Sequence, residues 1–261
     1  MKINNLEDGI TLANLTGYGL TSALESLNED EQIIWKNKIK AGNLYINRPT
    51  TGAIVCRQPF GGMNRSAFGT GIKAGGVNYI YQFLQFENIN LDNKTPNYLE
   101  IFTKYFSKEI DYADIPGQSN ITRFLKTDNI AIRATESSNI DDIKAIIIAA
   151  KLCVTNVYLS LESEKILELL KSSNEKISQY VKIEIESKEK FINKASNFKR
   201  IRIIPSNEDH SEIYNAAAKT GITIIADPII YNGRIELLNY LQEQSISNNY
   251  HRFGHAVSLK N

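Results

Sequence analysis

The sequence predicts an α/β protein with a mostly parallel sheet and helices on both of its faces. The main reason is that strand-like and helix-like segments alternate at a regular pitch from Ile121 onward, which is typical of a doubly wound, Rossmann-like domain. A second reason is that residues 6–46 read helix, strand, helix, strand. This first α/β segment is too short for a stable domain of its own, so we expect it to be the end of a larger one.

The first elements carry local signals. Residues 6–14 predict a short helix and residues 18–24 a strand. Asn28, with Glu31 three positions later, has the spacing of a capping box at the start of a helix. Gly42 suits the end of that helix.

The rest of the chain divides at a polar stretch. An alternating aromatic run at 78–86 predicts a strand, and residues 87–97 are polar and include a proline, as expected of a boundary. We therefore predict three segments, at 1–90, 91–120 (a linker) and 121–261. Further helices are expected at 98–106, 140–152, 162–172, 188–197, 209–220 and 234–244, and strands at 129–134, 154–161, 181–186, 200–205 and 222–226.

Composition excludes several classes of protein. The net charge of +1 gives no electrostatic reason to expect nucleic acid as a partner. No apolar run approaches the roughly 20 residues that cross a bilayer, and the N-terminus lacks the apolar core of a signal peptide. The expected location is therefore the cytoplasm, where the two cysteines, Cys56 and Cys153, would be reduced thiols.

The stretch 42–76 is the expected working surface, because its glycines favour a long held loop between short apolar runs. It contains Asn-Leu-Tyr-Ile-Asn at 43–47, Thr-Gly-Ala-Ile-Val at 51–55 and Gln-Pro-Phe-Gly-Gly at 58–62, with Tyr-Gly-Leu-Thr at 18–21 upstream. These motifs resemble the end of an aldehyde dehydrogenase catalytic domain. The run at 51–55 resembles in particular the branch that oxidises glutamate semialdehyde, the delta-1-pyrroline-5-carboxylate dehydrogenases.

The resemblance implies a substrate site made by three residues. In that branch the loop that matches Gly52 and Ala53 offers backbone N–H groups to the α-carboxylate of the substrate, and successive amides near a glycine can form such a concavity. Phe60 would correspond to an aromatic wall on the aliphatic part of the substrate. The family's cysteine nucleophile, general-base glutamate and NAD site lie upstream of the matched segment. The resemblance thus implies no catalytic residue in this chain, and little activity of the chain alone.

The second half also resembles a known family. Residues 117–122, 224–228, 234–247 and 250–254 are similar to the C-terminal domain of the long bifunctional proline utilisation A proteins. In that family a proline dehydrogenase with FAD makes pyrroline carboxylate, which hydrolyses to the semialdehyde that the NAD-dependent dehydrogenase oxidises. The C-terminal domain resembles an NAD domain without working as one, and its tail closes the channel between the two sites. A peripheral membrane association would belong to the parent protein.

Other motifs favour a structural interpretation. Gly69, Gly71 and Ala74 match a dinucleotide fingerprint, but neither a hydrophobic strand nor a helix flanks them. No glycine-rich turn follows the predicted strands of the second half. His251 and His255 have the spacing of metal ligands on a helix, but Gly254 argues against a helix there and no metal site is expected. Cys56 is expected to be a packed thiol.

Three functions remain open from the sequence. The first is the C-terminal part of a proline utilisation A enzyme, which supplies the substrate anchor and a channel-closing domain to the missing N-terminal catalytic region. The second is a free-standing interaction module that docks on a separately encoded catalytic half. The third, an independent nucleotide-binding protein, lacks phosphate-binding residues.

Overall fold

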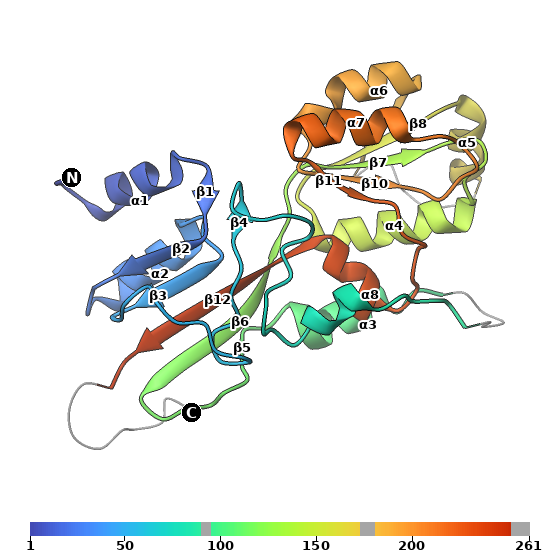
Figure 1. The fold of residues 1–261 in the computed structure, drawn as a ribbon. Coiled ribbons are helices and arrows are strands. Elements are labelled where there is room, and N and C mark those ends of the chain that lie inside the picture. Colours follow the sequence, from blue (N-terminus) through green and yellow to red (C-terminus); the bar gives the residue numbers. More distant parts are fainter. Residues whose placement is uncertain (90–94, 173–180, 252–261) are drawn as a thin grey trace. The chain divides into compact units, whose positions relative to one another are not determined.

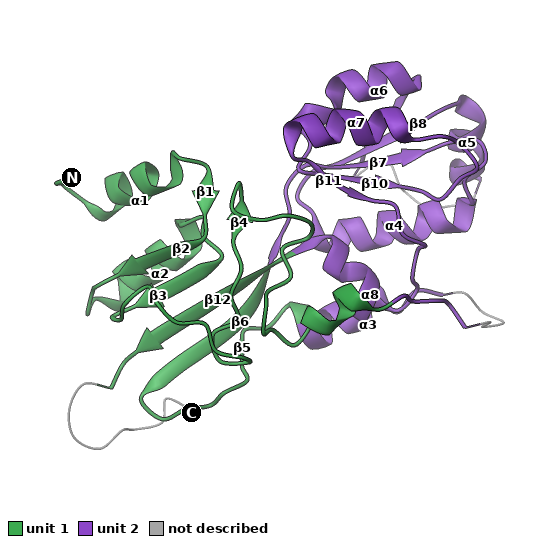
Figure 2. Cartoon of the chain, viewed as in Figure 1, with its two compact units in different colours: residues 1–84, 106–124, 242–261 green, residues 85–105, 125–241 purple. Residues whose placement is uncertain are grey.

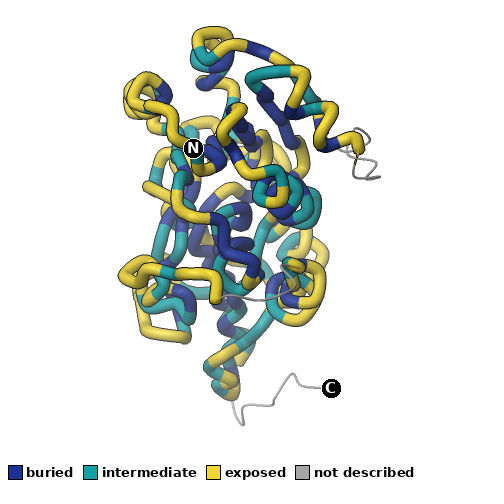
Figure 3. Tube along the Cα trace, turned by 90° about the vertical axis from the view of Figure 1, so that its right-hand side faces the viewer, coloured by how far each residue is buried: buried dark blue, intermediate teal, exposed yellow. Residues whose placement is uncertain are grey.

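The computed structural model describes residues 1–89, 95–172 and 181–251. The chain forms two compact units, each built from separate stretches of sequence (Figures 1 and 2). Unit 1 comprises residues 1–84, 106–124 and 242–261, and unit 2 comprises residues 85–105 and 125–241. Figure 3 marks the buried, intermediate and exposed segments along the chain. Several strands are buried over their whole length, among them residues 43–46, 130–134 and 157–161.

Unit 2 has the predicted parallel sheet. Its strand order is β11-β10-β7-β8-β9, and all four pairings are parallel. Helices α4 and α5 cover one face, and α6 and α7 cover the other, which is the doubly wound arrangement (Figure 1). The strands are β7 (Ile130–Ala134), β8 (Val157–Leu161), β9 (Val181–Ile185), β10 (Arg200–Ile203) and β11 (Thr223–Ile225); the helices are α4 (Ile140–Cys153), α5 (Glu164–Lys171), α6 (Lys188–Lys194, continued by η4 at Ala195–Asn197) and α7 (Ser211–Thr220).

Local signals set these helices where the sequence predicts them. Asn139 caps α4, because its side chain accepts hydrogen bonds from the amides of Asp141 and Asp142. Gly221 ends α7 in the left-handed conformation, at φ 72°. Between the α6–α7 layer and the sheet lies a core of buried apolar residues: Ala131, Tyr158, Phe191, Ala195, Ile201, Ile203 and Ile213.

Unit 1 has a second five-stranded sheet, of order β2-β3-β12-β6-β5. Strands β2, β3 and β12 are parallel, and β5 and β6 are antiparallel. Trp35 packs in the core beside β3, with Ile10, Ile39 and Leu44. The elements are α1 (Leu6–Asn14), β1 (Tyr18–Gly19), β2 (Thr21–Leu24), α2 (Glu29–Lys38), β3 (Asn43–Ile46), β4 (Met63–Asn64), η1 (Tyr79–Phe83), β5 (Ile110–Asp111), β6 (Gln118–Lys126) and β12 (Leu241–Asn249).

Two predicted elements are wrong, and a third is divided. The expected strand at 78–86 contains a 3-10 helix, η1. The expected helix at 234–244 stops after α8 (Gly233–Glu236) and η5 (Leu237–Asn239), and β12 follows. The strand expected at 18–24 is two strands, because β1 pairs with β4 and β2 pairs with β3.

Strand β12 misleads because it is polar and yet buried. Glu243, Gln244, Ser245 and Ser247 are all buried in the middle of the sheet. A polar segment of this kind resembles an exposed helix in the sequence, because the residues that hydrogen-bond to it lie far away in the chain.

The compact units do not follow the predicted boundaries at 91–120. By their contacts, residues 106–124 and 242–261 belong to the same unit as the first segment of the chain.

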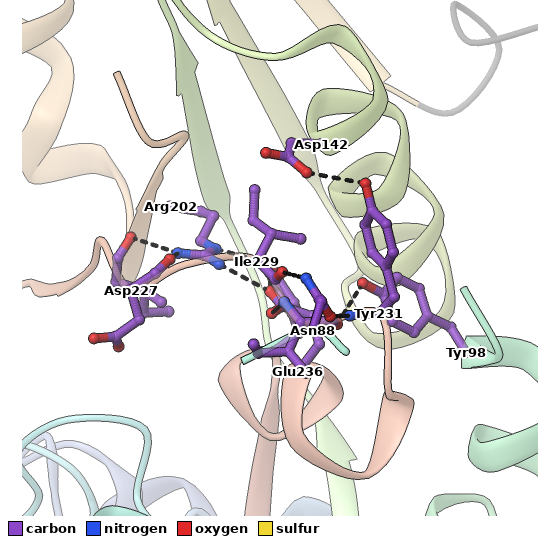
Figure 4. A network of polar contacts seen from close by, with 11 residues as sticks. Asn88, Tyr98, Asp142, Arg202, Asp227, Ile229, Tyr231 and Glu236 are labelled. Atoms are coloured by element: carbon purple, nitrogen blue, oxygen red, sulfur yellow. Dashed lines mark hydrogen bonds and ion pairs between the residues drawn. The ribbon is translucent and has the colours of Figure 1, made fainter. Parts of the chain in front are cut away.

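In unit 2 a buried polar network holds the segment that leads from β11 to α8 (Figure 4). Arg202 pairs with Glu236 at 3.2 Å, and both side chains are fully buried. Arg202 also donates to the carbonyl of Asp227 at 2.7 Å, and Glu236 accepts from the amide of Ile230 at 2.9 Å. Both buried charges are therefore paired and also bonded to backbone groups of the segment, as buried charges require.

The same segment is bonded to residues 85–105. Tyr98, from α3 (Tyr98–Ile101, followed by the π-helical residues Phe102–Phe106), donates its hydroxyl to the carbonyl of Ile230 at 2.8 Å. Asn88 donates to the carbonyl of Ile229 and accepts from the amide of Tyr231, at 2.7 and 2.9 Å (Figure 4). The expected helix at 98–106 therefore exists as a short α-helix with a π-helical end.

Candidate functional site

The loop that follows β3 in unit 1 contains all three predicted site residues. A tight turn closes at Ile54 and Gln58, whose backbone groups exchange hydrogen bonds of 3.2 and 2.7 Å. Phe60 and Ala74 form a second bridge, with two bonds of 2.9 Å. These bridges define the path of a loop that has little regular secondary structure.

Gly52 has a conformation that other residues avoid. Its φ is +119°, and a Cβ atom at this position would lie 2.9 Å from the Gln58 amide. The hydroxyl of Tyr45, on β3, donates to the Gly52 carbonyl at 3.0 Å. A glycine is therefore required here for conformation and for space.

The Gly52 carbonyl fixes the direction of the Ala53 amide. Both belong to one peptide group, and in a trans peptide the N–H points opposite to the C=O; every peptide bond of the described chain is trans. Because the carbonyl faces Tyr45, the Ala53 N–H faces away from it. Gly52 and Ala53 are exposed, and neither amide donates a hydrogen bond within the described residues. The loop thus offers two unbonded N–H groups to an acceptor.

Phe60 is half-buried, and its backbone is fixed by the bridge to Ala74. The structure brings Gly52 and Ala53 together as neighbours at an exposed position. It places Phe60 on the next bridge of the same loop, and no hydrogen bond of the described chain joins it to them.

Side chains behind Gly52 support the loop. The Arg48 guanidinium lies over the Tyr45 ring, 5.6 Å from its centre. The Gln58 amide satisfies its neighbours in one orientation, in which its nitrogen donates to the Gly52 carbonyl at 3.3 Å and its oxygen accepts from Arg48 Nη2 at 3.0 Å. Arg57 donates to the side-chain oxygen of Gln118, on β6. None of these supporting residues was predicted from the sequence.

A buried network fastens the glycine-rich loop to the sheet. The Glu243 carboxylate, on β12, accepts from the Lys73 backbone N–H at 2.9 Å and from the Asn78 amide at 2.6 Å. The Lys73 ammonium donates to Asn43, on β3, at 3.2 Å and to the Gly61 carbonyl. Burial lowers the pKa of Lys73 to about 7, against the opposing effect of Glu243.

No sequence signal identifies this network, because Lys73 and Glu243 are 170 positions apart. The packing of this stretch on β12 also explains the false dinucleotide fingerprint. Gly71 is buried against Gln242, because a Cβ atom on Gly71 would lie 2.2 Å from the side-chain nitrogen of Gln242. Lys73 is also buried. The glycines of this stretch permit close packing on β12.

Neither cysteine has the surroundings of a nucleophile. Cys56 is exposed rather than packed as expected, and it sits at φ +58° in the turn between Ile54 and Gln58. Cys153 is buried at the end of α4, and burial raises the pKa of its thiol to about 12. Where the chain is described, no group of three or more His, Cys, Asp or Glu could hold a metal ion; His255 lies outside that part.

The carboxyl edge of the unit 2 sheet does not suit a dinucleotide. The Thr135 amide donates to Ser138, and the Glu136 amide donates to the Glu162 carboxylate at 2.8 Å, so the N–H groups after β7 are occupied. Burial lowers the pKa of Arg133, and carboxylates around it oppose that effect: Glu162, Glu186, Glu208 and Glu189. A pyrophosphate at this edge would face carboxylates.

None of the helices in the described ranges is long and apolar enough to cross a membrane.

Comparison with known proteins agrees with the motifs. Residues 1–89 match the aldehyde dehydrogenase family. The 1-pyrroline-5-carboxylate dehydrogenase of Staphylococcus aureus (strain JH1) is 41% identical over 85 residues, which are 33% of this chain and 16% of that protein. Proteins of the same name from other strains, such as Mu50, match equally. The chain spans about a sixth of the length of these curated relatives.

One solved structure resembles nearly the whole chain. Proline utilization A from Corynebacterium freiburgense is 29% identical with a TM-score of 0.70, and the match covers 97% of this chain and 25% of that one. The predicted resemblance and the α/β fold class are thereby confirmed.

Proposed function

From the aldehyde dehydrogenase sequence of residues 1–89, we propose that this chain is the C-terminal part of a proline catabolic enzyme. Its dehydrogenase would oxidise L-glutamate 5-semialdehyde to glutamate with NAD. The support is the name of the Staphylococcus aureus relatives and the likeness to proline utilization A along both units.

Within that enzyme, unit 1 anchors the substrate. The observation that carries this proposal is the pair of exposed, unbonded N–H groups at Gly52 and Ala53, because successive backbone amides suit a carboxylate. Phe60 would contact the aliphatic part of the substrate. The aldehyde at the other end would then reach a catalytic cysteine outside this chain, and positioning of this kind can contribute several powers of ten in rate.

NAD, which accepts the hydride, would bind outside this chain. Unit 2 shares the doubly wound arrangement, but the carboxylates at its sheet edge oppose a pyrophosphate. FAD would belong to a proline dehydrogenase in the parent protein. Unit 2 and the tail would act as a non-catalytic domain that closes the channel between the two active sites. The proposed location is the cytoplasm.

The test compares this chain alone with the complete protein encoded by its reading frame. The complete protein should form NADH from glutamate semialdehyde, and the chain alone should not. Replacement of Gly52 by valine in the complete protein should raise KM for the semialdehyde at least tenfold, since the side chain would displace Gln58. Turnover by the chain alone would contradict the proposal.

A second function is supported by the large apolar side chains that unit 1 exposes, such as Val55 and Phe68. The chain would then be an interaction module that docks on a separately encoded catalytic half. A pull-down with the tagged chain should recover an aldehyde dehydrogenase that lacks this segment. Recovery of nothing, together with an upstream reading frame that encodes the catalytic region, would exclude this alternative.

A further inference from the structure

Two arginines, Arg48 and Arg57, lie close to each other near the proposed anchor. The charge of Arg57 is near enough to affect Arg48, whose pKa is lowered mainly by burial and in part by Arg57, while Tyr45 opposes the shift. Neither arginine makes an ion pair within 4.0 Å in the described ranges. Like charges held together in a half-buried site favour the arrival of an anion.

The guanidinium of Arg48 is aimed at Gly52. A Cβ atom on Gly52 would lie 3.7 Å from Arg48 Nη2, so the charge lies close behind the backbone of that residue. The Nε atoms of Arg48 and Arg57 are buried and have no hydrogen-bond partner in the part of the chain that is described. The two side chains are thus held in place without being neutralised.

The hydrogen bonds to the Gly52 carbonyl also favour an anion at this loop. Tyr45 and Gln58 both donate to the Gly52 carbonyl, and Gln58 is in turn held by Arg48. Donation to a carbonyl polarises its peptide group, and this makes the N–H of the same group a stronger donor. That N–H belongs to Ala53 and faces away from Tyr45.

We propose that Arg48 and Arg57 form a cationic base behind the Gly52–Ala53 peptide, which selects aldehydes that carry a carboxylate. Arg48 is a positioning residue in this arrangement, because it acts through Gln58 and through its charge. Arg57 adds charge and is tethered to β6 by Gln118. The inference rests on the proposed function, since it assigns the anion at this loop to the substrate.

The experiment compares two aldehydes of equal chain length in the complete protein. Glutamate semialdehyde carries the carboxylate, and pentanal does not. For Arg48→Met the ratio of kcat/KM for the semialdehyde to that for pentanal should fall at least tenfold, mainly through KM. Arg48→Lys keeps a positive charge but loses the planar guanidinium that faces Gln58, so it should lower this ratio less than Arg48→Met does. Arg57→Met should lower the ratio by a smaller factor than Arg48→Met.

Arg65→Met is the matched control. Arg65 is an exposed arginine of the same unit, over the Tyr18 ring at 5.1 Å, and its loss removes one charge elsewhere. The ratio should remain at the wild-type value. If Arg48→Met and Arg65→Met leave the same ratio, the cationic base is refuted.

The two proposals fail differently. If the wild-type protein does not oxidise the semialdehyde at all, the proposed function fails. If it does so, and Arg48→Met lowers kcat/KM for both aldehydes by one factor, then Arg48 only holds the loop and the present inference fails. A misfolded variant is recognised when the same substitution in this chain alone changes the emission of Trp35, the chain's single tryptophan, which is buried in unit 1.

Discussion

Unit 2 encloses its apolar side chains, whereas unit 1 leaves many of them in solvent. In unit 2 the exposed large apolar residues are scattered, such as Leu169 and Tyr214. In unit 1 they follow one another along the chain, as at Ile54 and Val55 and again at Tyr79 and Ile80. A monomeric domain rarely exposes such runs unless they contact a partner or another part of the protein. We propose from this difference that unit 2 is a complete structural domain, whereas unit 1 is incomplete without a partner or a further part of the protein.

The two units also bury their charges differently. In unit 2 the Glu236 carboxylate faces a cation, Arg202, at 3.2 Å. In unit 1 the Glu243 carboxylate accepts hydrogen bonds from two neutral donors, the Asn78 amide and the Lys73 backbone N–H. The first arrangement is an ion pair in direct contact. In the second, the Lys73 ammonium donates to two neutral acceptors, Asn43 and the Gly61 carbonyl, and the Glu243 charge opposes the effect of burial on the pKa of Lys73. The energetic consequences can be tested separately, because each unit contains its own reporter.

The largest expected difference is in thiol reactivity. Cys56 is exposed in unit 1, while Cys153 is buried in unit 2 with its pKa raised to about 12 by burial. A buried thiol reacts only when its unit opens, so Cys56 should react with a thiol reagent at least ~1,000-fold faster than Cys153. Cys56→Ser should abolish the fast phase alone. Equal rates for both thiols would show that unit 2 is not closed.

Loss of a buried charge partner should destabilise unit 2 strongly. Glu236→Ala leaves Arg202 buried and unpaired, which costs about 3–5 kcal/mol. The midpoint of urea unfolding, followed by Cys153 labelling, should fall accordingly. Glu7→Ala removes an exposed carboxylate that pairs with Lys38, and it should not change the midpoint. If both variants unfold alike, the Arg202–Glu236 pair does not stabilise unit 2.

The elements of unit 2 were predictable because their signals are local. The Asn139 cap and Gly221 lie at the ends of their own helices, and the strands between them carry apolar residues at regular positions, such as Ile201 and Ile203 in β10. Strand β12 was not predictable, since Ser245 and Ile246 pair with Asn43 and Leu44, about two hundred residues earlier. Its buried polar residues carry no periodic signal.

The candidate site also has a predictable part and an unpredictable part. Gly52 and Ala53 were predictable, because they belong to a motif that the order of residues along the loop is enough to recognise. The support behind them depends on side chains that meet only in the folded loop, namely Tyr45, Arg48 and Gln58. No spacing rule covers such contacts. The roles assigned to Gly52, Ala53 and Phe60 remain predictions.

Lys73 should make unit 1 more stable in alkaline solution. Its pKa is about 7 when folded, against 10.5 for an unperturbed lysine, so above pH 7 the unfolded chain binds more protons than the folded one. Stability should then rise with pH between these two values, by up to about 1.4 kcal/mol per pH unit. Urea unfolding followed by Trp35 should show this rise, and Lys73→Met should remove it. Glu243 is the charged group that faces Lys73. Parallel curves for both proteins would contradict the assignment.

The smallest expected effects come from two helix caps of the same chemistry. Asn28 caps α2 in unit 1 by accepting from the amides of Asp30 and Glu31, at 2.9 and 3.4 Å. Asn139 does the same for α4 in unit 2, at 2.8 and 3.4 Å. Replacement of either by alanine should cost about 1 kcal/mol.

These two variants show whether the units unfold separately. If they do, Asn28→Ala should shift the Trp35 transition and leave Cys153 labelling unchanged, and Asn139→Ala should do the reverse. A shift of both reporters by either variant would mean that the units unfold as one cooperative block. In that case the exposed apolar residues of unit 1 would not prevent it from sharing the stability of unit 2, and the distinction between a complete and an incomplete unit would have to be abandoned.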